Sequence, residues 1–519
     1  MKILIATLLL SALWGITNCS QRTKQQQKPN IIFILADDMG YGDIETFNPQ
    51  CKINTPNLNT LSEEGMMFTD AHTSSSVCTP TRYGLLTGRY NWRSRLKSGV
   101  LNGVSTALIP ESRTTVASLL KKEGYNTGFI GKWHLGWSWG LKDNIHTSTG
   151  NTFPIKMDDI DYGKPIAHTP NDLGFDYSCA IPASLDMPPY VYVINRRVTS
   201  PPATVTGSKE KYSWWRKGPT GADFHHIEVT PKFFDNAISY IKESANRGQP
   251  FFLYLALPSP HTPILPTAQW QGKSGLNPYG DFVMMVDYYV GKLLAAVTAA
   301  GIEDNTLVIF TSDNGCSPQA DFELLKEKGH NPSYIYRGYK ADIYEGGHRV
   351  PFIAKWPKVI MRGSVSDETI CTTDLFATCA EISGYHLSDN EGEDSYSLLP
   401  LFKRRVLGRS FREATIHSSI NGSFAIRKGD YKLIMCPGSG GWSYPRPHDK
   451  IISSLPKVQL YNLRLDPRES NNLQAENPDK IAELKSLLEK YITEGRSTPG
   501  TPQANDAVNF KWEQIDFTK

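Results

Sequence analysis

The apolar positions of this chain fall into two kinds of pattern. Three runs, NIIFILA (30–36), PFFLYLAL (250–257) and TLVIFTS (306–312), are continuously apolar, as is typical of strands buried on both faces of a sheet. Between these runs, residues 114–125 and 230–248 have apolar positions spaced as in an amphipathic helix. The second stretch begins with Thr-Pro, and each stretch has a glycine near its C-terminal end, as helices often do. Strands that alternate with helices predict a largely parallel α/β sheet.

The pattern changes in the last part of the chain. Residues 422–436 predict two short strands joined by a Gly-Asp turn, and residues 459–473 predict a further strand and a turn. A helix is expected over 477–495. The large α/β domain is therefore followed by a smaller α+β domain. Such a hairpin unit buries little core alone, so we expect it to cover one side of a cleft in the large domain.

The N-terminus has a different pattern. One lysine precedes an apolar run from Ile3 to Ile16, which is short for a membrane span and typical of a signal-peptide core. We therefore expect export, to the periplasm or the cell surface. Cys19 follows this core and precedes a polar, Gln-rich stretch, as in bacterial lipoproteins, although Thr17 and Asn18 make a poor processing site. A lipid anchor at Cys19 and cleavage without a lipid are the two alternatives.

These patterns divide the chain into four parts. We predict a signal peptide over 1–19, which is the lipoprotein signal if Cys19 is lipidated, and a solvated linker over 20–28. A catalytic α/β domain is expected over 29–400, and the smaller α+β domain over 401–519.

Composition narrows the class of protein. The 519 residues are 39% hydrophobic and 21% charged, which fits a folded protein with a large core. The net charge is only +3, so the chain as a whole lacks the basic excess that is typical of nucleic-acid-binding proteins. Eight cysteines in so long a chain, with no CxxC, make neither a disulfide scaffold nor a metal finger, and their pairing cannot be read from sequence.

Polar side chains follow two of the predicted strands. Asp37 and Asp38 come after the first, and Asp313 and Asn314 follow the run at 306–312. Ligands of open α/β sheets bind beyond the carboxyl ends of the strands. Either pair alone is explained by turns and helix caps. Together they predict a site for a hard cation, Ca²⁺ or Mg²⁺, because all the donors are oxygens.

Four basic side chains lie at similar places. Lys132 and His134 are two apart in GFIGKWHLG, His261 lies in the proline-bounded LPSPHTPILP, and Lys340 lies in the Gly-containing segment YRGYKADIYEGGHRVP. Each alone is explained by a surface lysine or a packed histidine. Together with a cation they suit an ester whose charge is spread over several oxygens, because fixed cations stabilise charge that develops in the transition state. This set contains no nucleophile.

The stretch CTPTRYGLLTG (Cys78–Gly88) matches the pattern C-x-P-[S/T/A]-R-x4-T-G at every fixed position, with Thr81 where Ser is commonest. The segments ADDMGYGD, GKWHLG, SPHTP, TSDNG and YEGGHRVP occur with it in a fixed order. Over about residues 28–475 the chain thus resembles the formylglycine-dependent (type I) sulfatases, arylsulfatase A-like, and among them the bacterial exported carbohydrate sulfatases. The resemblance implies an alkaline-phosphatase-like fold, with a large mixed, mostly parallel sheet between helices.

The resemblance also implies the nucleophile. In that family a separate maturation enzyme oxidises the cysteine equivalent to Cys78 to Cα-formylglycine (3-oxoalanine). One hydroxyl of the hydrated aldehyde attacks sulfur, and the second expels sulfate. The alternative is a cysteine that is never converted and simply packs. Pro80 suits a first helical turn, which would place residue 78 at a helix N-terminus that favours anions. The implied Ca²⁺ ligands are an oxygen of residue 78 together with Asp37, Asp38, Asp313 and Asn314.

The remaining roles are implied in the same way. Arg82 would steady the hydrated aldehyde, and Lys132 and Lys340 would bind the sulfate oxygens. His134 would take a proton during sulfate release. His261 would protonate or polarise the leaving alcohol, as general acid catalysis requires.

Substrate contacts are less closely defined. Ser184, in AIPASLDMPP, resembles the serine that in relatives contacts His134 or the sulfate. KYSWWRKG suits a cleft that faces a sugar, with Trp214 or Trp215 stacking on the ring and arginines binding further sulfates; core packing is the alternative. The resemblance thus favours calcium-dependent hydrolysis of sulfate esters on a sulfated mono-, oligo- or polysaccharide.

Two other functions are weighed against it. A phosphoester or phosphonate ester hydrolase of the same superfamily would use a similar arrangement, and a second metal site would favour it. A non-catalytic receptor for sulfated glycans at the cell surface would have no need of the full set of catalytic positions.

Overall fold

The computed structural model describes residues 28–143, 155–405 and 411–506, and its centre is a ten-stranded sheet with the order β13-β2-β12-β11-β1-β10-β4-β5-β6-β7. The bounds of these strands are β1 Asn30–Asp37, β2 Met66–Phe68, β4 Asn126–Lys132, β5 Tyr177–Ile181, β6 Val193–Ile194, β7 Arg197–Val198, β10 Phe251–Pro260, β11 Thr306–Ser312, β12 Phe352–Lys355 and β13 Ser364–Ser366. The strands predicted from the three apolar runs are confirmed as β1, β10 and β11, which are adjacent.

The middle of the sheet is parallel and its flanks are mixed. β1 lies parallel to both β10 and β11, with Ile32 opposite Leu253 and Val308. β10, β4 and β5 continue the parallel run, whereas β12 is antiparallel to both β11 and β2. Every residue of β10 and β11 is buried, which explains why their sequences are continuously apolar rather than alternating.

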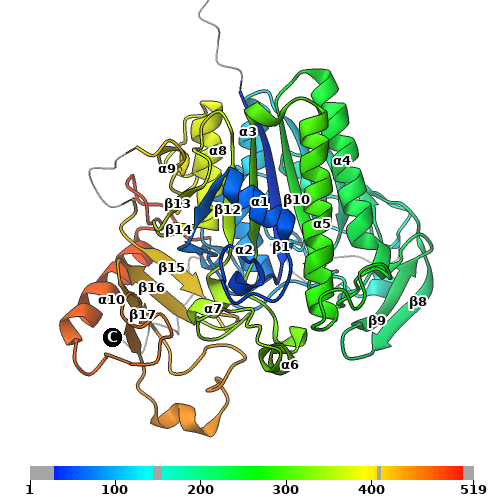
Figure 1. The fold of residues 1–519 in the computed structure, drawn as a ribbon. Helices are drawn as coiled ribbons and strands as arrows, with labels where there is room; N and C mark the ends of the chain where they lie inside the picture. The colour runs from blue at the N-terminus through cyan, green and yellow to red at the C-terminus, as the bar shows by residue number, and fades with distance from the viewer. Residues whose placement is uncertain (1–27, 144–154, 406–410, 507–519) are drawn as a thin grey trace, which may run out of the picture.

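Helices cover both faces of this sheet (Figure 1). Successive residues of a strand point to opposite faces, so Phe33 of β1 packs in one core and Ile34 in the other. The Phe33 side includes α2 Cys78–Thr87, α3 Val116–Lys122 and α8 Leu375–Ser383. The Ile34 side includes α1 Pro56–Glu64, α4 Val229–Arg247 and α5 Pro278–Ala299.

The helices expected at 114–125 and 230–248 are observed as α3 and α4. α3 is several residues shorter than the sequence predicted. Thr115 caps it, since its hydroxyl accepts a hydrogen bond from the Ser118 amide at 3.1 Å. α4 ends at Arg247, and Gly248 caps it in the left-handed conformation that glycine allows, with a φ of 68°. Among the described helices only α5 is long and apolar enough to cross a membrane, but it packs against α4 and β10 inside the protein.

A second, antiparallel sheet forms the C-terminal part, with α10 Pro478–Thr493 against it. Its strands are β15 Thr415–Ser418, β16 Phe424–Lys428, β17 Tyr431–Ile434 and β18 Gln459–Asn462. The predicted hairpin is confirmed as β16 and β17, joined at Gly429 and Asp430. The predicted fold class, a mixed and mostly parallel sheet between helices with a smaller α+β unit, is likewise confirmed. The boundary at 400/401 stays a prediction, and the signal peptide and Cys19 lie outside the described residues.

The carboxyl ends of the parallel strands meet at the lower end of the large sheet as Figure 1 shows it, between two smaller structures. The C-terminal sheet lies on one side. On the other is a separate hairpin, β8 Pro202–Lys209 and β9 Trp214–Gly221, whose two strands form a sheet of their own. The seven cysteines within the described ranges are all free thiols.

Candidate active site

The four oxygen-bearing residues predicted at the strand ends lie together. β1 ends at Asp37, and Asp38 follows in the left-handed conformation with a φ of 67°. The Asp38 amide donates to Oδ1 of Asp313 at 3.2 Å, and the Asn314 side-chain amide donates to Oδ1 of Asp38 at 2.7 Å. The pairing of β1 with β11 therefore brings two sequence-distant pairs of residues into one cluster.

Each of the three carboxylates in this cluster has a basic partner. Lys132 Nζ lies 2.6 Å from Asp37 Oδ2, and Lys340 Nζ lies 2.6 Å from Asp38 Oδ1. Arg82 donates to Asp313 Oδ2 through Nη2 at 2.7 Å and through Nε at 3.0 Å.

Three ion pairs therefore lie in one buried centre. Burial raises the pKa of Asp37, but the charges of Lys132, His261 and Arg82 outweigh it and hold that pKa well below its ordinary value. Burial lowers the pKa of Lys340, and the carboxylate of Asp38 more than reverses this.

The donors in this centre fit a hard cation. Asp37 Oδ1 and Asn314 Oδ1 are buried and lack a hydrogen-bond partner among the described residues. Burial, and then the negative charge of Asp37, raise the pKa of Asp313 to about 7. Ligand atoms of Asp37, Asp38 and His261 also lie within 4.8 Å of one another. Buried carboxylate and amide oxygens without a hydrogen-bond partner suit Ca²⁺ or Mg²⁺.

Cys78 is the first residue of α2, after the N-cap Val77, and is buried. It lines a cavity of about 290 Å³ together with Ser184, His261 and Lys340. The helix N-terminus predicted from Pro80 is therefore present, and its free N–H groups favour an anion. Burial raises the pKa of the Cys78 thiol above its ordinary value. Because the thiolate is the reactive form, the unmodified cysteine is a poor nucleophile at neutral pH.

His134 is held as a neutral base. Its backbone has a φ of 54°, and its Nε2 lies 2.7 Å from the Leu101 carbonyl oxygen. A carbonyl only accepts, so Nε2 carries the proton and Nδ1 is the acceptor. Nδ1 is buried and has no hydrogen-bond partner among the described residues. Burial, and then the charge of Lys132, hold the pKa of His134 well below its ordinary value.

His261 has the opposite arrangement. Its Nδ1 lies 2.5 Å from the Thr262 carbonyl oxygen and donates to it, and its Nε2 lies 3.6 Å from Asp38 Oδ2. The ring lines the cavity. One nitrogen is thus fixed by the backbone, and the other lies near the Asp38 carboxylate on a ring that lines the cavity.

The cavity wall contains Ser184 and one of the two tryptophans that the sequence offered for the cleft. Ser184 lines the cavity, and its hydroxyl donates to Asp186 Oδ1 at 2.6 Å. Trp214 lines the same cavity, whereas Trp215 stacks on His226 with ring centroids 4.3 Å apart. Of the two tryptophans offered for the cleft, Trp214 is therefore the one in position.

Several further cavity residues were missed by sequence reasoning. They are Asp186, Met187, Ser317, Gln319, Ile420 and Trp442, from four separate stretches of the chain; Arg216 also lines the cavity and belongs to the stretch KYSWWRKG that the sequence offered for the cleft. Asp186 lies two residues after Ser184, and that spacing is the one signal that sequence offers. The presence of Ile420 and Trp442 agrees with the expectation that the C-terminal part covers one side of the cleft.

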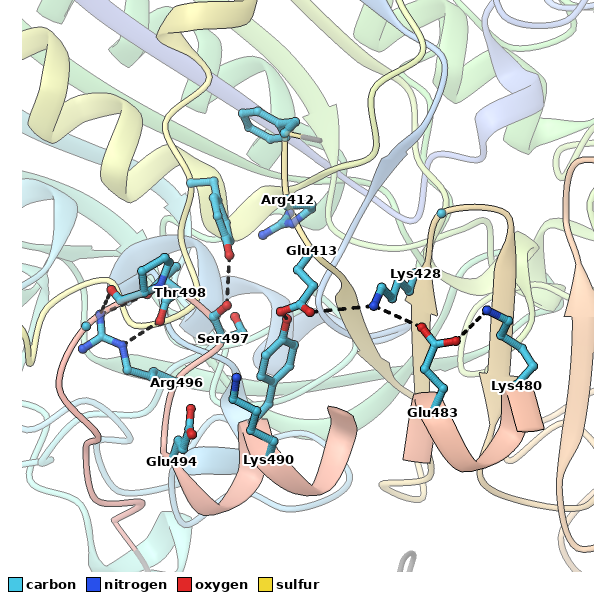
Figure 2. Close-up of a pocket in the computed structure, with 16 residues that line it drawn as sticks. Arg412, Glu413, Lys428, Lys480, Glu483, Lys490, Glu494, Arg496, Ser497 and Thr498 are labelled. Carbon is cyan, nitrogen blue, oxygen red and sulfur yellow. Dashed lines mark hydrogen bonds and ion pairs between the residues drawn. The ribbon is translucent and has the colours of Figure 1, made fainter. Parts of the chain in front are cut away.

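A larger cavity lies elsewhere in the described part of the chain. Its volume is about 830 Å³, and α10, β16 and the segment after α10 line it (Figure 2). Lys428 bonds to Glu413 and Glu483 there, and Lys480 bonds to Glu483. This cavity contains none of the predicted site residues. We therefore assign the site to the smaller cavity at the strand ends.

A second cluster of metal-ligand types is already satisfied by hydrogen bonds. Among His72, His348 and His417, the His72 and His348 rings meet Nδ1 to Nδ1 at 3.0 Å. Lys432 donates to His348 Nε2 at 2.9 Å, so His348 donates from Nδ1 to His72, and His72 donates to Asp70 Oδ1 at 2.8 Å. The chain of donors and acceptors is complete without an ion, and it joins the C-terminal sheet to the large domain.

Fold and site together are those of a hydrolase for a strongly anionic ester. The sequence profile of the Sulfatase family matches residues 29–385, so the chain belongs to the sulfatase family and is a sulfuric ester hydrolase. An N-acetylgalactosamine-6-O-sulfatase of Bacteroides thetaiotaomicron is 32% identical, over 93% of this chain and 98% of that one. Human arylsulfatase A is 31% identical, over 88% of this chain and 87% of its own length.

Solved structures agree with this assignment. A structure from Bacteroides thetaiotaomicron, described under the metabolism of multiple glycosaminoglycans, superposes with a TM-score of 0.76 at 31% identity. It covers 89% of this chain and 99% of its own. A sulfatase from Pseudoalteromonas sp. superposes with a TM-score of 0.67 at 23% identity, over 92% of this chain and 93% of its own, and it supports the fold alone.

Proposed function

We propose that the protein hydrolyses a sulfate ester on a carbohydrate, with residue 78 as formylglycine. One Ca²⁺ would be held by an oxygen of residue 78 together with Asp37, Asp38, Asp313 and Asn314. One observation carries the proposal: the cavity wall joins Cys78, His261 and Lys340 beside a buried centre of carboxylates with unpaired oxygens. The raised pKa of the Cys78 thiol supports conversion, because the thiol itself is not activated. A formylglycine-maturing enzyme is therefore a required partner.

Binding of the sulfate group falls to the basic side chains. Lys132 is the last residue of β4, and Lys340 lies in the segment after α6 Phe322–Glu327. Both ammonium groups are buried, and a fixed charge acts more strongly there than in water. Arg82 fixes Asp313 and also donates from Nη1 to the Lys132 carbonyl oxygen at 3.0 Å. It thus ties α2 to the strand ends and positions residue 78.

The implied groups supply what these residues lack. A hydrated aldehyde at residue 78 supplies a nucleophilic hydroxyl and a second hydroxyl for sulfate release, and a bound Ca²⁺ would polarise sulfate oxygens. His134 keeps an unprotonated Nδ1 at neutral pH, which suits it to accept the proton during release. His261 lines the cavity, and in the imidazolium form, in which both ring nitrogens carry a proton, its Nε2 is suited to donate a proton to the leaving alcohol.

The substrate class follows from the wall and from the relatives. Trp214 and Trp442 line the cavity, and aromatic faces stack on the C–H surfaces of sugars. The relative from Bacteroides thetaiotaomicron is named for N-acetylgalactosamine 6-O-sulfate. We therefore propose sulfated glycans that contain galactose or N-acetylhexosamine. We further propose that the enzyme is exported to the periplasm or the cell surface, where such glycans are met.

Release of free sulfate from a panel of sulfated mono- and oligosaccharides tests this function. The protein is first checked by peptide mass for formylglycine at residue 78, and Cys78→Ala is the control. We expect release from at least one sugar and none by the variant. Release that is equal with Cys78→Ala would contradict the proposed nucleophile, and a glycan receptor would then be the better interpretation.

A phosphoesterase is the second outcome to test. It would be favoured by phosphate release and by two metal ions per chain in metal analysis. The other cluster of metal-ligand types, around His72, is filled by its own hydrogen bonds, which supports a single metal and a sulfate ester.

A further inference from the structure

Asp186 and Arg216 form an ion pair in the wall of the active-site cavity. Arg216 Nη1 bonds to Oδ2 of Asp186 and also to its carbonyl oxygen at 3.2 Å. Ser184 donates to the other carboxylate oxygen, Oδ1, at 2.6 Å. The Asp186 side chain is 5% exposed and that of Arg216 is 49% exposed. The pair therefore has a fixed carboxylate in the wall and a guanidinium that reaches the opening.

The pair lies beside the groups that handle the leaving alcohol. Asp186 and Arg216 line the same cavity as Cys78 and His261. The leaving sugar occupies the part of the cavity beyond the sulfate, and His261 is the residue suited to protonate its oxygen. The sugar ring would therefore lie against the Asp186 and Arg216 wall.

The hairpin presents Arg216 together with an aromatic surface. Trp214 and Arg216 are two apart on β9 and both line the cavity. Trp215, between them, stacks on His226 outside the cavity lining. This alternation is that of a strand, whose successive side chains point to opposite sides. The Arg216 guanidinium lies 5.0 Å from the centre of the Trp214 ring, so a ring face and hydrogen-bond donors lie close together.

Charge decides what this wall can bind. A site for a second sulfate or for a carboxylate needs a cation that is not already neutralised, but Arg216 is paired with the buried Asp186, so the pair has no net charge. Such a pair offers both kinds of hydrogen bond. The carboxylate oxygens of Asp186 keep lone pairs, and Nε and Nη2 of Arg216 have no hydrogen-bond partner among the described residues. Hydroxyl groups, which donate and accept, match this pattern.

We propose that Asp186 and Arg216 determine specificity by binding two neighbouring hydroxyl groups of the sugar that carries the scissile sulfate, with the ring against Trp214. Asp186 accepts from one hydroxyl, and Arg216 donates to the other. The sugar recognised is thus neutral apart from its one sulfate. This inference rests on the proposed function, since it assigns the leaving group of that reaction.

Kinetics on matched substrates test the pair. The enzyme with formylglycine at residue 78 is compared with Arg216→Ala, Asp186→Asn and the control Lys217→Ala, an exposed neighbour on β9 that does not line the cavity. The substrates are a monosulfated hexose, its deoxy analogues, a disulfated hexose and 4-nitrophenyl sulfate, which has no sugar hydroxyls. Arg216→Ala alters an exposed side chain and is the variant to rely on if Asp186→Asn does not fold.

We expect Arg216→Ala to lower kcat/KM on the monosulfated hexose roughly 10- to 100-fold, the range for hydrogen bonds to a charged group. Hydrolysis of 4-nitrophenyl sulfate should be unchanged, and Lys217→Ala should match the parent on every substrate. For the parent enzyme, removing one of the sugar hydroxyls should lower kcat/KM by as much as Arg216→Ala does. For Arg216→Ala, removing the same hydroxyl should lower kcat/KM no further. An equal loss on both esters, or a loss confined to the disulfated hexose, would overturn the proposal.

A binding measurement separates this inference from the proposed function. Tryptophan fluorescence of the parent and of Arg216→Ala is titrated with the unsulfated hexose, which needs no turnover. Saturable binding by the parent alone supports recognition of hydroxyls even if no ester is cleaved. Sulfate release by the parent without any difference between the two titrations would leave the function standing and overturn the role of the pair.

Discussion

Nζ of Lys132 lies 2.6 Å from Oδ2 of Asp37, and neither side chain has any exposure to solvent. Removing the lysine would leave a buried carboxylate without its nearest cation. We expect Lys132→Ala to lose about 3–5 kcal/mol of stability and roughly 100- to 1000-fold in kcat from the lost charge in the site. Denaturant unfolding and sulfate release measure the two effects. Lys242→Ala, at an exposed position of α4, is the control; similar stabilities of the two variants would contradict this account of the pair.

Calcium removal should both inactivate and destabilise the enzyme. Because unpaired oxygens of Asp37 and Asn314 lie in the buried centre, a chelator should abolish sulfate release and lower the Tm, and added Ca²⁺ should restore both. Asn314→Ala should weaken Ca²⁺ binding in a calorimetric titration, whereas the surface variant Glu327→Gln should bind as the parent does. A Tm that is unchanged by chelator would argue against a metal at this centre.

The role proposed for His261 depends on the leaving group. His261→Ala should lower kcat/KM on a sugar sulfate by roughly 100- to 10,000-fold, the range of general acid catalysis. It should cost much less on 4-nitrophenyl sulfate, because nitrophenolate leaves without a proton. His225→Ala removes a histidine whose side chain is 62% exposed and should change neither rate. Equal losses on the two esters would point to sulfate binding instead.

The buried histidines should make the protein sensitive to mild acid. Burial lowers the pKa of His72, and burial with neighbouring positive charge lowers that of His348 and His417 further. Below about pH 6.5 the unfolded chain binds protons that the folded protein does not. The free energy of unfolding therefore decreases as the pH is lowered, by about 1.4 kcal/mol per pH unit for each such histidine.

Unfolding measured from pH 7 to 5 checks this expectation. His348→Gln should reduce the slope, and His225→Gln should not. A stability that stays constant between pH 7 and 5.5 would mean that these rings are protonated in the folded protein.

Export and lipidation can be separated by one substitution. The apolar run before Cys19 predicts an exported protein whichever alternative holds. If Cys19 carries the lipid, Cys19→Ser should move the enzyme from the membrane fraction to a released form, and the mature parent should begin at a lipid-modified cysteine by mass. If the parent is already released after fractionation, cleavage without a lipid is correct.

Sequence predicted best where one physical signal acts alone. β1 and β11 are continuous apolar runs because both faces are covered, and the turn at Gly429 and Asp430 marks the hairpin β16 and β17. The strand-end acids follow from the topology of a parallel sheet. β6 and β7 have two residues each, too few for any period to show.

The cavity wall could not be predicted in the same way. Asp186, Arg216 and Trp442 come from three segments that only the folded chain brings together. The choice between Trp214 and Trp215 depends on which side of β9 faces inward, and no local pattern encodes that register. Charge pairing in the buried centre likewise depends on contacts between residues far apart in sequence, such as Lys340 and Asp38.

The β8–β9 hairpin forms a sheet of its own, so it can be exchanged without changing the strands of the large sheet. Its two strands pair with each other and not with the ten-stranded sheet, yet it supplies Trp214 and Arg216 to the cavity. The ion-paired centre that would cleave the ester is built on the large sheet and on α2. Exchanging the hairpin for that of another sulfatase should therefore change Trp214 and Arg216 while Asp186 and the machinery of cleavage stay in place.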